Sequence, residues 1–285
     1  MRIATYTNAR GDSLSFRPGS PFVISDIQGL GDVDATVQLQ QAPYQDGGSY
    51  IDSLLSPRAI SFRVWIDGKD DSDISRKRSQ LSSLFNPKLG PGIFEYRYGD
   101  QVRQIAAVAE HVPSFPTGFD SRGRRHQVAV IDLLCPNPYW RSLTVTEEPA
   151  FEPLFEFPFE GKFEFGVTRN DRLIYNDGDA PTSFNIDFYG PADRPIIENL
   201  TTGEFIRINK RLEEGQTLKI DTTDGVKSVT YVDEDGTETN VFHWIDLSST
   251  FFKLGIGDND ITCHCAISNN QRDFDIYYSK LYNAI

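Results

Sequence analysis

Short segments that alternate polar and apolar residues, separated by turn dipeptides, make up most of this 285-residue chain. Alternation with period two places successive side chains on opposite faces of a strand, and glycine beside aspartate favours a tight turn. Residues 59–66 alternate in this way, and residues 127–134 are rich in β-branched residues that suit a buried strand. The turn dipeptides are Gly11-Asp12, Asp46-Gly47, Asp67-Gly68, Asp177-Gly178, Asp224-Gly225 and Asp235-Gly236. The pattern predicts a mainly β protein.

One segment departs from this pattern and predicts a single α-helix near residues 73–85. The apolar residues of its stripe are Ile74, Leu81, Leu84 and Phe85. Ser72 and Asp73 have side-chain oxygens that can accept from the first free amides of a helix. Asn86-Pro87 ends it, because proline disfavours helical geometry in the residue before it. Its basic residues 76–78 are expected on the exposed face.

A change in composition after the prolines at positions 136 and 138 predicts a domain boundary. We expect an N-terminal domain over residues 1–140 and a C-terminal domain over residues 141–285, entered through the Phe/Glu/Pro-rich segment 149–166. Prolines forbid a helix in that segment, so an extended conformation is expected. Its phenylalanines suit an ordinary core strand, the joint between the domains or a subunit interface. The candidates for such a contact are Phe157, Phe159, Phe163 and Phe165.

The charge and cysteine content exclude several classes of protein. Lys and Arg number 28 against 41 Asp and Glu, so the net charge of −13 opposes binding to nucleic-acid phosphates. Three cysteines cannot build a disulfide framework, and the polar start at Met1-Arg2-Ile3 lacks the apolar core of a signal peptide. Apolar runs are too short for a membrane span. We therefore expect synthesis in a cytoplasm and no insertion into a membrane.

Gly11-Asp12-Ser13-Leu14 matches the motif that gives the GDSL hydrolases their name, in which the serine is the nucleophile. Such a serine follows an apolar parallel strand and needs a histidine and an aspartate to take its proton. Here the preceding residues 7–10 are polar, and no Asp-x-x-His occurs near the C-terminus. A hairpin turn explains the four letters better, and we predict no catalytic residue.

Cys263-His264-Cys265 suggests zinc, because thiolates and imidazoles are its preferred ligands. In a strand, however, His264 points away from the face that both cysteines share, and the sequence has no second cysteine pair to complete four ligands. Buried thiols in a core strand are the better interpretation. Acidic segments such as residues 70–73, 233–236 and 258–260 suit turns and caps better than calcium loops. We predict no metal site and no cofactor.

Arg122-Gly123-Arg124-Arg125 is a basic cluster in an acidic chain. A nucleic-acid surface requires several such clusters with aromatic residues between them. Arg122, Arg124 and Arg125 therefore form either a solvated hairpin tip or one half of a contact with an acidic neighbouring subunit.

The order of several motifs resembles the distal tail proteins of long-tailed bacteriophages. In the first half these motifs are an opening hairpin around Gly11, Ile27-Gln28-Gly29-Leu30, Arg58-x-Ile60-x-Phe62, Arg78-x-x-Leu81 with Phe85-Asn86-Pro87, and Cys135-Pro136-Asn137-Pro138-Tyr139-Trp140. In the second half they are the Phe-rich segment, residues 175–180, residues 199–204 and residues 254–259. Ile256 departs from the proline that the family often has before this last glycine.

The resemblance implies an N-terminal β-sandwich with one helix and a C-terminal galectin-like β-sandwich, and no inserted carbohydrate-binding module. It implies a hub at the tail tip of the virion: a homo-hexameric ring that connects the tail tube protein to the tail-associated fibre or lysin protein. Receptor-binding proteins are possible further partners, and DNA passes through the channel of the ring without sequence-specific binding. No enzymatic activity is implied.

Two other functions stay open from the sequence. The first is a carbohydrate-binding β-sandwich protein that attaches to the host cell surface through exposed aromatic residues such as Trp244 or Tyr139. The second is an esterase that uses Ser13, which the polar surroundings of the motif disfavour.

Overall fold

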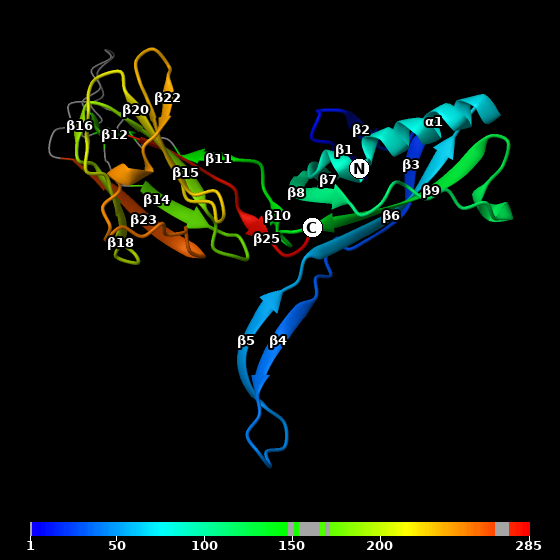
Figure 1. Cartoon of the computed structure of the whole chain (residues 1–285), viewed down its shortest axis with the longest axis horizontal. Coiled ribbons are helices and arrows are strands. Elements are labelled where there is room, and N and C mark those ends of the chain that lie inside the picture. Colours follow the sequence, from blue (N-terminus) through cyan, green and yellow to red (C-terminus); the bar gives the residue numbers. More distant parts are fainter. Residues whose placement is uncertain (1, 148–150, 154–165, 169–171, 266–273) are drawn as a thin grey trace. The chain divides into compact units, whose positions relative to one another are not determined.

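The computed structural model describes residues 2–147, 151–153, 166–168, 172–265 and 274–285 (Figure 1). The described part is mostly β, with several antiparallel sheets and one α-helix, as predicted. The chain divides into two compact units, and each is described by itself. Unit 1 contains Met1–Leu143 together with Tyr282–Ile285, and unit 2 contains Thr144–Leu281. The last residues of the chain therefore belong to the first unit, and the short strand β25 (Leu281–Tyr282) contains the crossing point.

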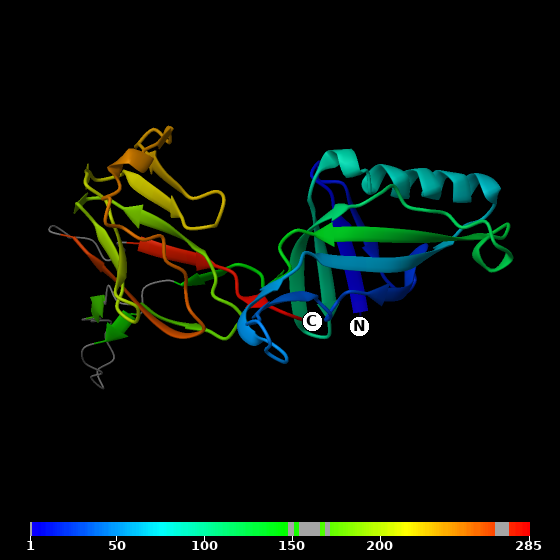
Figure 2. The same cartoon turned by 60° about the horizontal axis from the view of Figure 1, so that its bottom comes forward.

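Unit 1 is built on one curved antiparallel sheet with the strand order β2-β1-β7-β8-β9-β6-β3 (Figure 2). The strands are β1 (Arg2–Thr7), β2 (Ser13–Phe16), β3 (Phe22–Gln28), β6 (Arg58–Asp67), β7 (Gly92–Tyr98), β8 (Gln101–Ala109) and β9 (His126–Cys135). Strand β10 (Trp140–Arg141) pairs with β8, and a short 3-10 helix, η2 (Phe119–Ser121), precedes β9. The outer strands β2 and β3 contact each other, so the sheet curves around a common core.

Helix α1 (Asp71–Leu84) packs an apolar stripe against this core, with Ile74, Leu81 and Leu84 buried. The helix starts two residues earlier than expected, because Asp70 is the capping residue and its side chain accepts from the amide of Asp73 at 2.9 Å. Phe85 ends the helix and stacks on Tyr6 with ring centroids 4.5 Å apart. The 3-10 helix η1 (Pro87–Leu89) follows. The stripe predicted from helical spacing is therefore the face that holds α1 on the sheet.

Asp73 binds the first turn of α1 to its surroundings and makes this turn sensitive to acid. Its carboxylate accepts from the amide of Lys69 at 3.1 Å and pairs with Lys77 at 2.8 Å and with Arg76. The hydrogen bond from Lys77 is the largest of the causes that hold the pKa of Asp73 well below its usual range. A lowered pKa gives stability that is present above the pKa of the unfolded chain and is lost as the pH falls toward the folded value.

We expect Asp73→Asn to lower the melting temperature by several degrees at neutral pH and to weaken the dependence of stability on pH in the acid range. Circular dichroism melts between acid and neutral pH would measure both effects. Asp71→Asn is the control, because Asp71 is exposed in the same turn. An unchanged acid dependence in Asp73→Asn would show that this carboxylate is not the group responsible.

Unit 2 contains two antiparallel sheets whose residues share one core. The first sheet has the order β11 (Val145–Glu147), β24 (Phe274–Tyr278), β15 (Phe184–Tyr189), β20 (Thr217–Asp221), β21 (Ser228–Val232) and β22 (Glu238–Asn240). The second has the order β14 (Arg172–Asn176), β23 (Gly257–His264), β17 (Ile196–Asn199) and β18 (Glu204–Arg207). Two small pairs, β12 (Phe151–Pro153) with β13 (Gly166–Thr168) and β16 (Ala192–Asp193) with β19 (Arg211–Leu212), and the 3-10 helix η3 (Phe242–Trp244) complete the described elements. The galectin-like arrangement of this unit stays a prediction.

A half-buried carboxylate, Asp187, lies in the first sheet of unit 2. Asp187 lies directly opposite Asp275 on β24 and opposite Lys219 on β20. Burial raises the pKa of Asp187, with a further contribution from the charge of Asp275, while Lys219 opposes both. The folded protein therefore binds a proton on Asp187 more tightly than the unfolded chain does. The stability that comes from this proton is present at low pH, and it is lost as the pH rises from the unfolded pKa of Asp187 through its folded pKa.

We expect Asp187→Asn to raise the melting temperature of unit 2 at neutral pH by a few degrees and to flatten its decline with rising pH. Differential scanning calorimetry at several pH values would measure this change. Asp258→Asn, at an exposed position of the same unit, is the matched control. A lower melting temperature at neutral pH would mean that the attraction to Lys219 outweighs the cost of burial.

Candidate assembly surface

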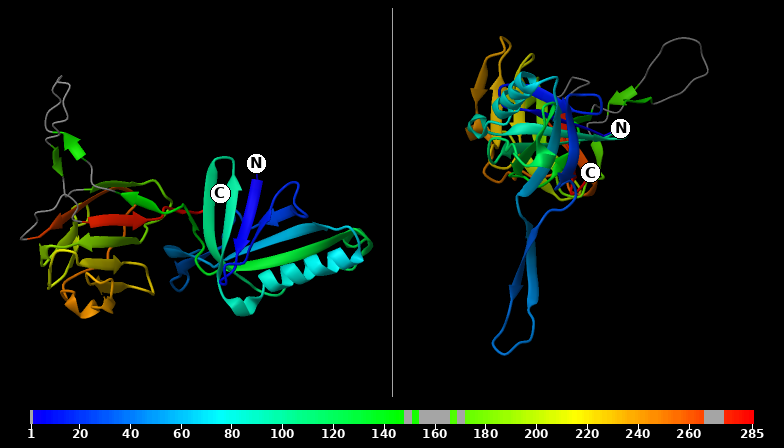
Figure 3. Two further views of the ribbon diagram at one scale, coloured as in Figure 1. Left: turned by 90° about the horizontal axis from the view of Figure 1, so that it is seen from above. Right: turned by 90° about the vertical axis from the view of Figure 1, so that its right-hand side faces the viewer.

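A two-stranded hairpin projects from the rest of unit 1, and we call residues 35–55 the arm (Figures 1 and 3). Strand β4 (Ala35–Gln40) pairs with β5 (Ser49–Leu55), and every side chain of these strands is exposed except the half-buried Leu55. The expected turn at Asp46-Gly47 lies near the tip, where Gly47 has a φ of 73°. The arm therefore makes its strand pairing without burying a side-chain layer of its own.

One face of the arm is apolar. Leu39 lies opposite Tyr50, and Val37 lies opposite Ser53, so these residues share a face. Val37, Leu39 and Tyr50 are 53%, 60% and 64% exposed. On the other face Gln38 lies opposite Asp52 and Thr36 lies opposite the exposed Leu54, so that face is mixed. An isolated two-stranded hairpin is marginally stable, and open strand edges with exposed apolar side chains mark surfaces that another chain covers. The arm thus has the properties of an unoccupied contact surface.

The root of the arm is held firmly to unit 1. The Ser56 amide donates to Asp34 at 2.8 Å and closes the hairpin, and the indole of Trp140 donates to the carbonyl of Leu30 at 3.0 Å. Gly29 has a φ of 86°, and a Cβ atom there would lie 2.0 Å from the carbonyl oxygen of Ala59. Only glycine fits this position, so the chain enters the arm along a fixed path.

Arg58 is the residue that fixes this root. The residue is 1% exposed, and its guanidinium donates to three backbone carbonyls. These belong to Gly29 at 2.9 Å, Pro138 at 2.8 Å and Asn283 at 2.5 Å. One side chain therefore binds the root of the arm at Gly29, the segment before β10 at Pro138 and the C-terminal tail at Asn283. Burial lowers the pKa of Arg58. Burying a charged group is unfavourable, and hydrogen bonds to three acceptors offset this cost.

The predicted basic cluster lies at a hairpin tip before β9. Arg122, Arg124 and Arg125 are all exposed. The amide of Gly123 donates to the carbonyl of His126 at 2.9 Å, which closes the turn. Phe119 beside the cluster is 96% exposed. The structure therefore presents a basic and aromatic tip, whose role as a contact stays a prediction.

Phe157, Phe159, Phe163 and Phe165 lie outside the described residues. Their predicted packing at a joint or interface stays a prediction.

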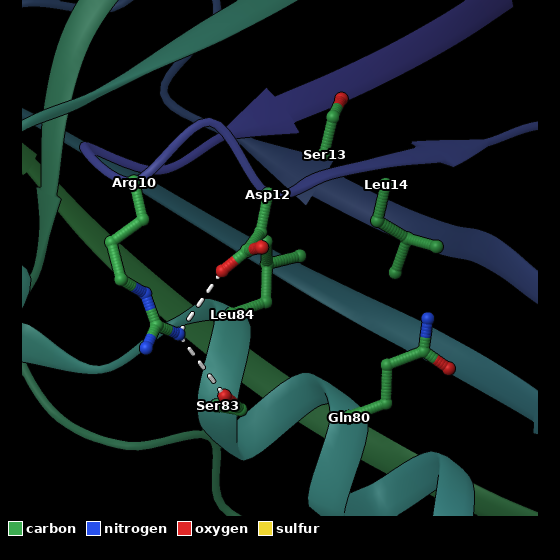
Figure 4. A pocket seen from close by; sticks show the side chains of 7 residues that line it. All are labelled: Arg10, Asp12, Ser13, Leu14, Gln80, Ser83 and Leu84. Carbon is green, nitrogen blue, oxygen red and sulfur yellow. Dashed lines mark hydrogen bonds and ion pairs between the residues drawn. The ribbon is translucent and has the colours of Figure 1, made fainter.

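Ser13 lies at the rim of an open depression of about 580 Å³ between β2 and α1 (Figure 4). Its hydroxyl accepts from Thr7 at 3.1 Å and points away from the ion pair that Arg10 and Asp12 form at 3.0 Å. The depression is lined by Arg10, Asp12, Ser13, Leu14, Gln80, Ser83 and Leu84, and its one carboxylate, Asp12, is paired with Arg10. This geometry favours the hairpin interpretation of the Gly-Asp-Ser-Leu motif.

The candidate metal ligands are not brought together within the part of the chain that the structure describes. There, no group of three or more His, Cys, Asp or Glu side chains could hold a metal ion. Cys263 is buried in β23, as the core-strand interpretation predicts, and Cys265 is half-buried. No described helix is long and apolar enough to cross a membrane.

Comparison with known families identifies the chain. The model of the phage tail protein RIFT-related domain matches residues 9–135, and the model of the siphovirus-type tail component, C-terminal domain, matches residues 177–282. The two matches follow each other and together span most of the chain. The chain belongs to the family of siphovirus-type distal tail proteins. The resemblance inferred from the sequence motifs is thereby confirmed.

Solved structures show the same fold for this distal tail protein. The crystal structure of the Dit protein of phage SPP1, described as a paradigm of the hub adsorption apparatus in phages that infect Gram-positive bacteria, matches with a TM-score of 0.69 at 12% identity. The match covers 99% of each chain. A chain of the phage P2 baseplate in its activated conformation with Ca matches with a TM-score of 0.62 at 12% identity over 100% of each chain. No curated protein matches the sequence. The family matches make the chain a phage tail component, and these solved structures show its fold.

Proposed function

We propose that six copies of this distal tail protein form a closed ring at the tip of the phage tail. The ring connects the tail tube protein to the tail-associated fibre or lysin protein, offers its periphery to receptor-binding proteins, and lets DNA pass through its channel. The observation that carries this proposal is the arm, whose exposed apolar face and fixed root suit a contact with the next copy. A contact between two different surfaces repeats head to tail and closes into a ring when the rotation allows.

Charge complementarity between two parts of the chain supports head-to-tail assembly of the copies. Residues 35–55 contain Asp46 and Asp52 and no lysine or arginine, so the arm is acidic. The basic tip at Arg122, Arg124 and Arg125 has the opposite charge and is fully presented to solvent. Opposite charges on two parts of one chain steer copies into a heterologous contact and oppose pairing of like surfaces.

Assembly of this kind needs no chemical step, and we propose that the protein is not an enzyme. The geometry at Ser13 supports this view, because its hydroxyl has Thr7 as its partner and not a base. As a ring component the protein would be made in the host cytoplasm and reside in the virion.

Native mass spectrometry of the purified protein at high concentration, alone and mixed with its tail tube protein, tests the proposal. We expect a hexamer in at least one of these samples. Monomers that persist in every mixture would contradict the hub function.

A further inference from the structure

A shallow depression on unit 2 combines one aromatic ring with hydrogen-bonding groups of both kinds. It consists of two adjoining hollows of about 490 and 390 Å³, which share Asp193, Arg194 and Asn209. Volumes of this size suit a small ligand. Among its charged and aromatic residues the first hollow adds Lys210, Arg211, Glu213, Tyr231 and Trp244, and the second adds Arg207 and Asp246. The depression belongs to unit 2, whereas the arm belongs to unit 1.

Trp244 forms an ordered wall of the first hollow. The backbone amide of Asn209 donates to the carbonyl of Trp244 at 2.8 Å, and this bond holds η3 to the segment after β18. The ring of Tyr231 meets the indole edge to face with centroids 5.4 Å apart. The indole is half-buried, and the Nζ atom of the exposed Lys210 lies 5.4 Å from its centroid. A flexible ammonium group at the surface can move aside, so the indole face is available to a ligand.

The polar groups around Trp244 are held in place before any ligand arrives. The side-chain amide of Asn209 donates to the carboxylate of Asp246 at 3.2 Å. The hydrogen bonds from Ser248 and Asn209 lower the pKa of Asp246 to about 2, so this carboxylate is an ionised acceptor at neutral pH. Arg194 has a φ of 48°, a left-handed conformation that is unusual for a residue other than glycine. Such conformations recur where a side chain is positioned for binding.

The charges of the depression select the class of ligand. Arg194, Arg207, Lys210 and Arg211 supply donors, whereas Asp193, Glu213 and Asp246 supply acceptors, so the lining offers groups of both kinds. Arg211 pairs with Glu213 at 3.1 Å, and Arg194 lies 3.6 Å from Asp193. A phosphate or carboxylate ligand accepts hydrogen bonds only and would face three carboxylates. A sugar hydroxyl both donates and accepts, and the apolar face of a pyranose ring covers an aromatic ring without charge.

We infer that this depression binds a neutral saccharide, with Trp244 covering one face of the sugar ring and Asn209, Arg194 and Asp246 bonding its hydroxyl groups. Tyr139, the other aromatic residue considered from the sequence, is half-buried in unit 1 and lines neither hollow.

Saturation-transfer NMR on the full chain tests this inference with four probes. Methyl galactoside, methyl glucoside and N-acetylglucosamine are the neutral sugars, and glycerol phosphate is the anion. We expect transfer to at least one neutral sugar and none to glycerol phosphate. Trp244→Ala should abolish the transfer, and Asn209→Ala should weaken binding about tenfold, the usual effect of removing one well-placed hydrogen-bonding group. Tyr175→Ala removes another exposed aromatic side chain of unit 2 and should change nothing.

Three results would overturn the inference: no transfer to any neutral sugar, transfer to glycerol phosphate alone, or transfer to a neutral sugar that survives both Trp244→Ala and Asn209→Ala. If Trp244→Ala does not fold, the exposed Asn209→Ala and Arg194→Ala decide, because neither residue belongs to the buried core. A chain that does not form a ring can still be tested for sugar binding, because saturation transfer requires only that unit 2 is folded.

Discussion

Replacing Val37 and Leu39 of the arm by aspartate is expected to leave a folded monomer and to prevent formation of the ring. Both side chains are more than half exposed in the single chain, so their replacement should change its stability by no more than about 0.5 kcal/mol. In the ring they would be buried, and each loses about 2 kcal/mol or more of apolar contact. Two such losses at every interface weaken each contact more than about 100-fold. Sedimentation velocity would show the shift from hexamer to monomer.

Gln38→Asp is the matched control for this experiment. It adds one of the two charges of the double variant to the same strand, but on the mixed face, where Gln38 lies opposite Asp52. We expect this variant to assemble normally. Rings that form equally well from the Val37→Asp, Leu39→Asp double variant would show that the apolar face of the arm is not the contact between copies.

Arg58→Met is expected to have the largest effect on the stability of the single chain. The substitution removes three charge-assisted hydrogen bonds and leaves the carbonyls of Gly29, Pro138 and Asn283 without their donor. A hydrogen bond from a charged donor contributes about 1.5 kcal/mol, so the loss of three costs about 3–5 kcal/mol, which corresponds to a fall in melting temperature of about 10 °C for a unit of this size. Hydrogen exchange should become faster at the root of the arm and in the C-terminal tail at the same time.

Arg63→Met on the same strand is the control, because Arg63 is exposed. Arg58→Lys should be nearly as damaging as Arg58→Met, since one ammonium group cannot reach three carbonyls in the geometry of a guanidinium fork. Faster exchange at the arm alone, with the tail unchanged, would mean that Arg58 does not hold the tail.

The β architecture and the helix could be predicted because they depend on local periodicity. The spacing of Ile74, Leu81 and Leu84 matches the face that α1 buries. Only the start of the helix was misplaced, because aspartates at positions 70, 71 and 73 all suit a cap and the choice among them depends on the surrounding contacts.

The arm could not be predicted, although its strands and turn have ordinary sequences. Val37 and Leu39 alternate with polar residues as in any strand with one buried face. Alternation shows that one face is apolar but not which surface covers it. The exposure of that face appears only in the tertiary structure. Arg58 was noticed as part of a family motif, but its three acceptors lie in segments far apart in the sequence.

Trp244 shows the same limit at the candidate saccharide site. The sequence predicted an exposed aromatic residue, and the structure gives a half-buried one beside Asn209 and Arg194. These residues come from separate strands and loops, so no spacing in the sequence brings them together. The basic tip at Arg122, Arg124 and Arg125 was predicted as a solvated hairpin or a contact, and the structure presents all three side chains as exposed.

Electron microscopy of the wild-type assembly tests the central claim most directly. The account predicts class averages of a closed ring with sixfold symmetry and a central channel, and a reconstruction in which the arm of each copy lies on the next copy. Rings whose arms extend free into solvent, open filaments, or particles of single chains at every concentration would contradict it.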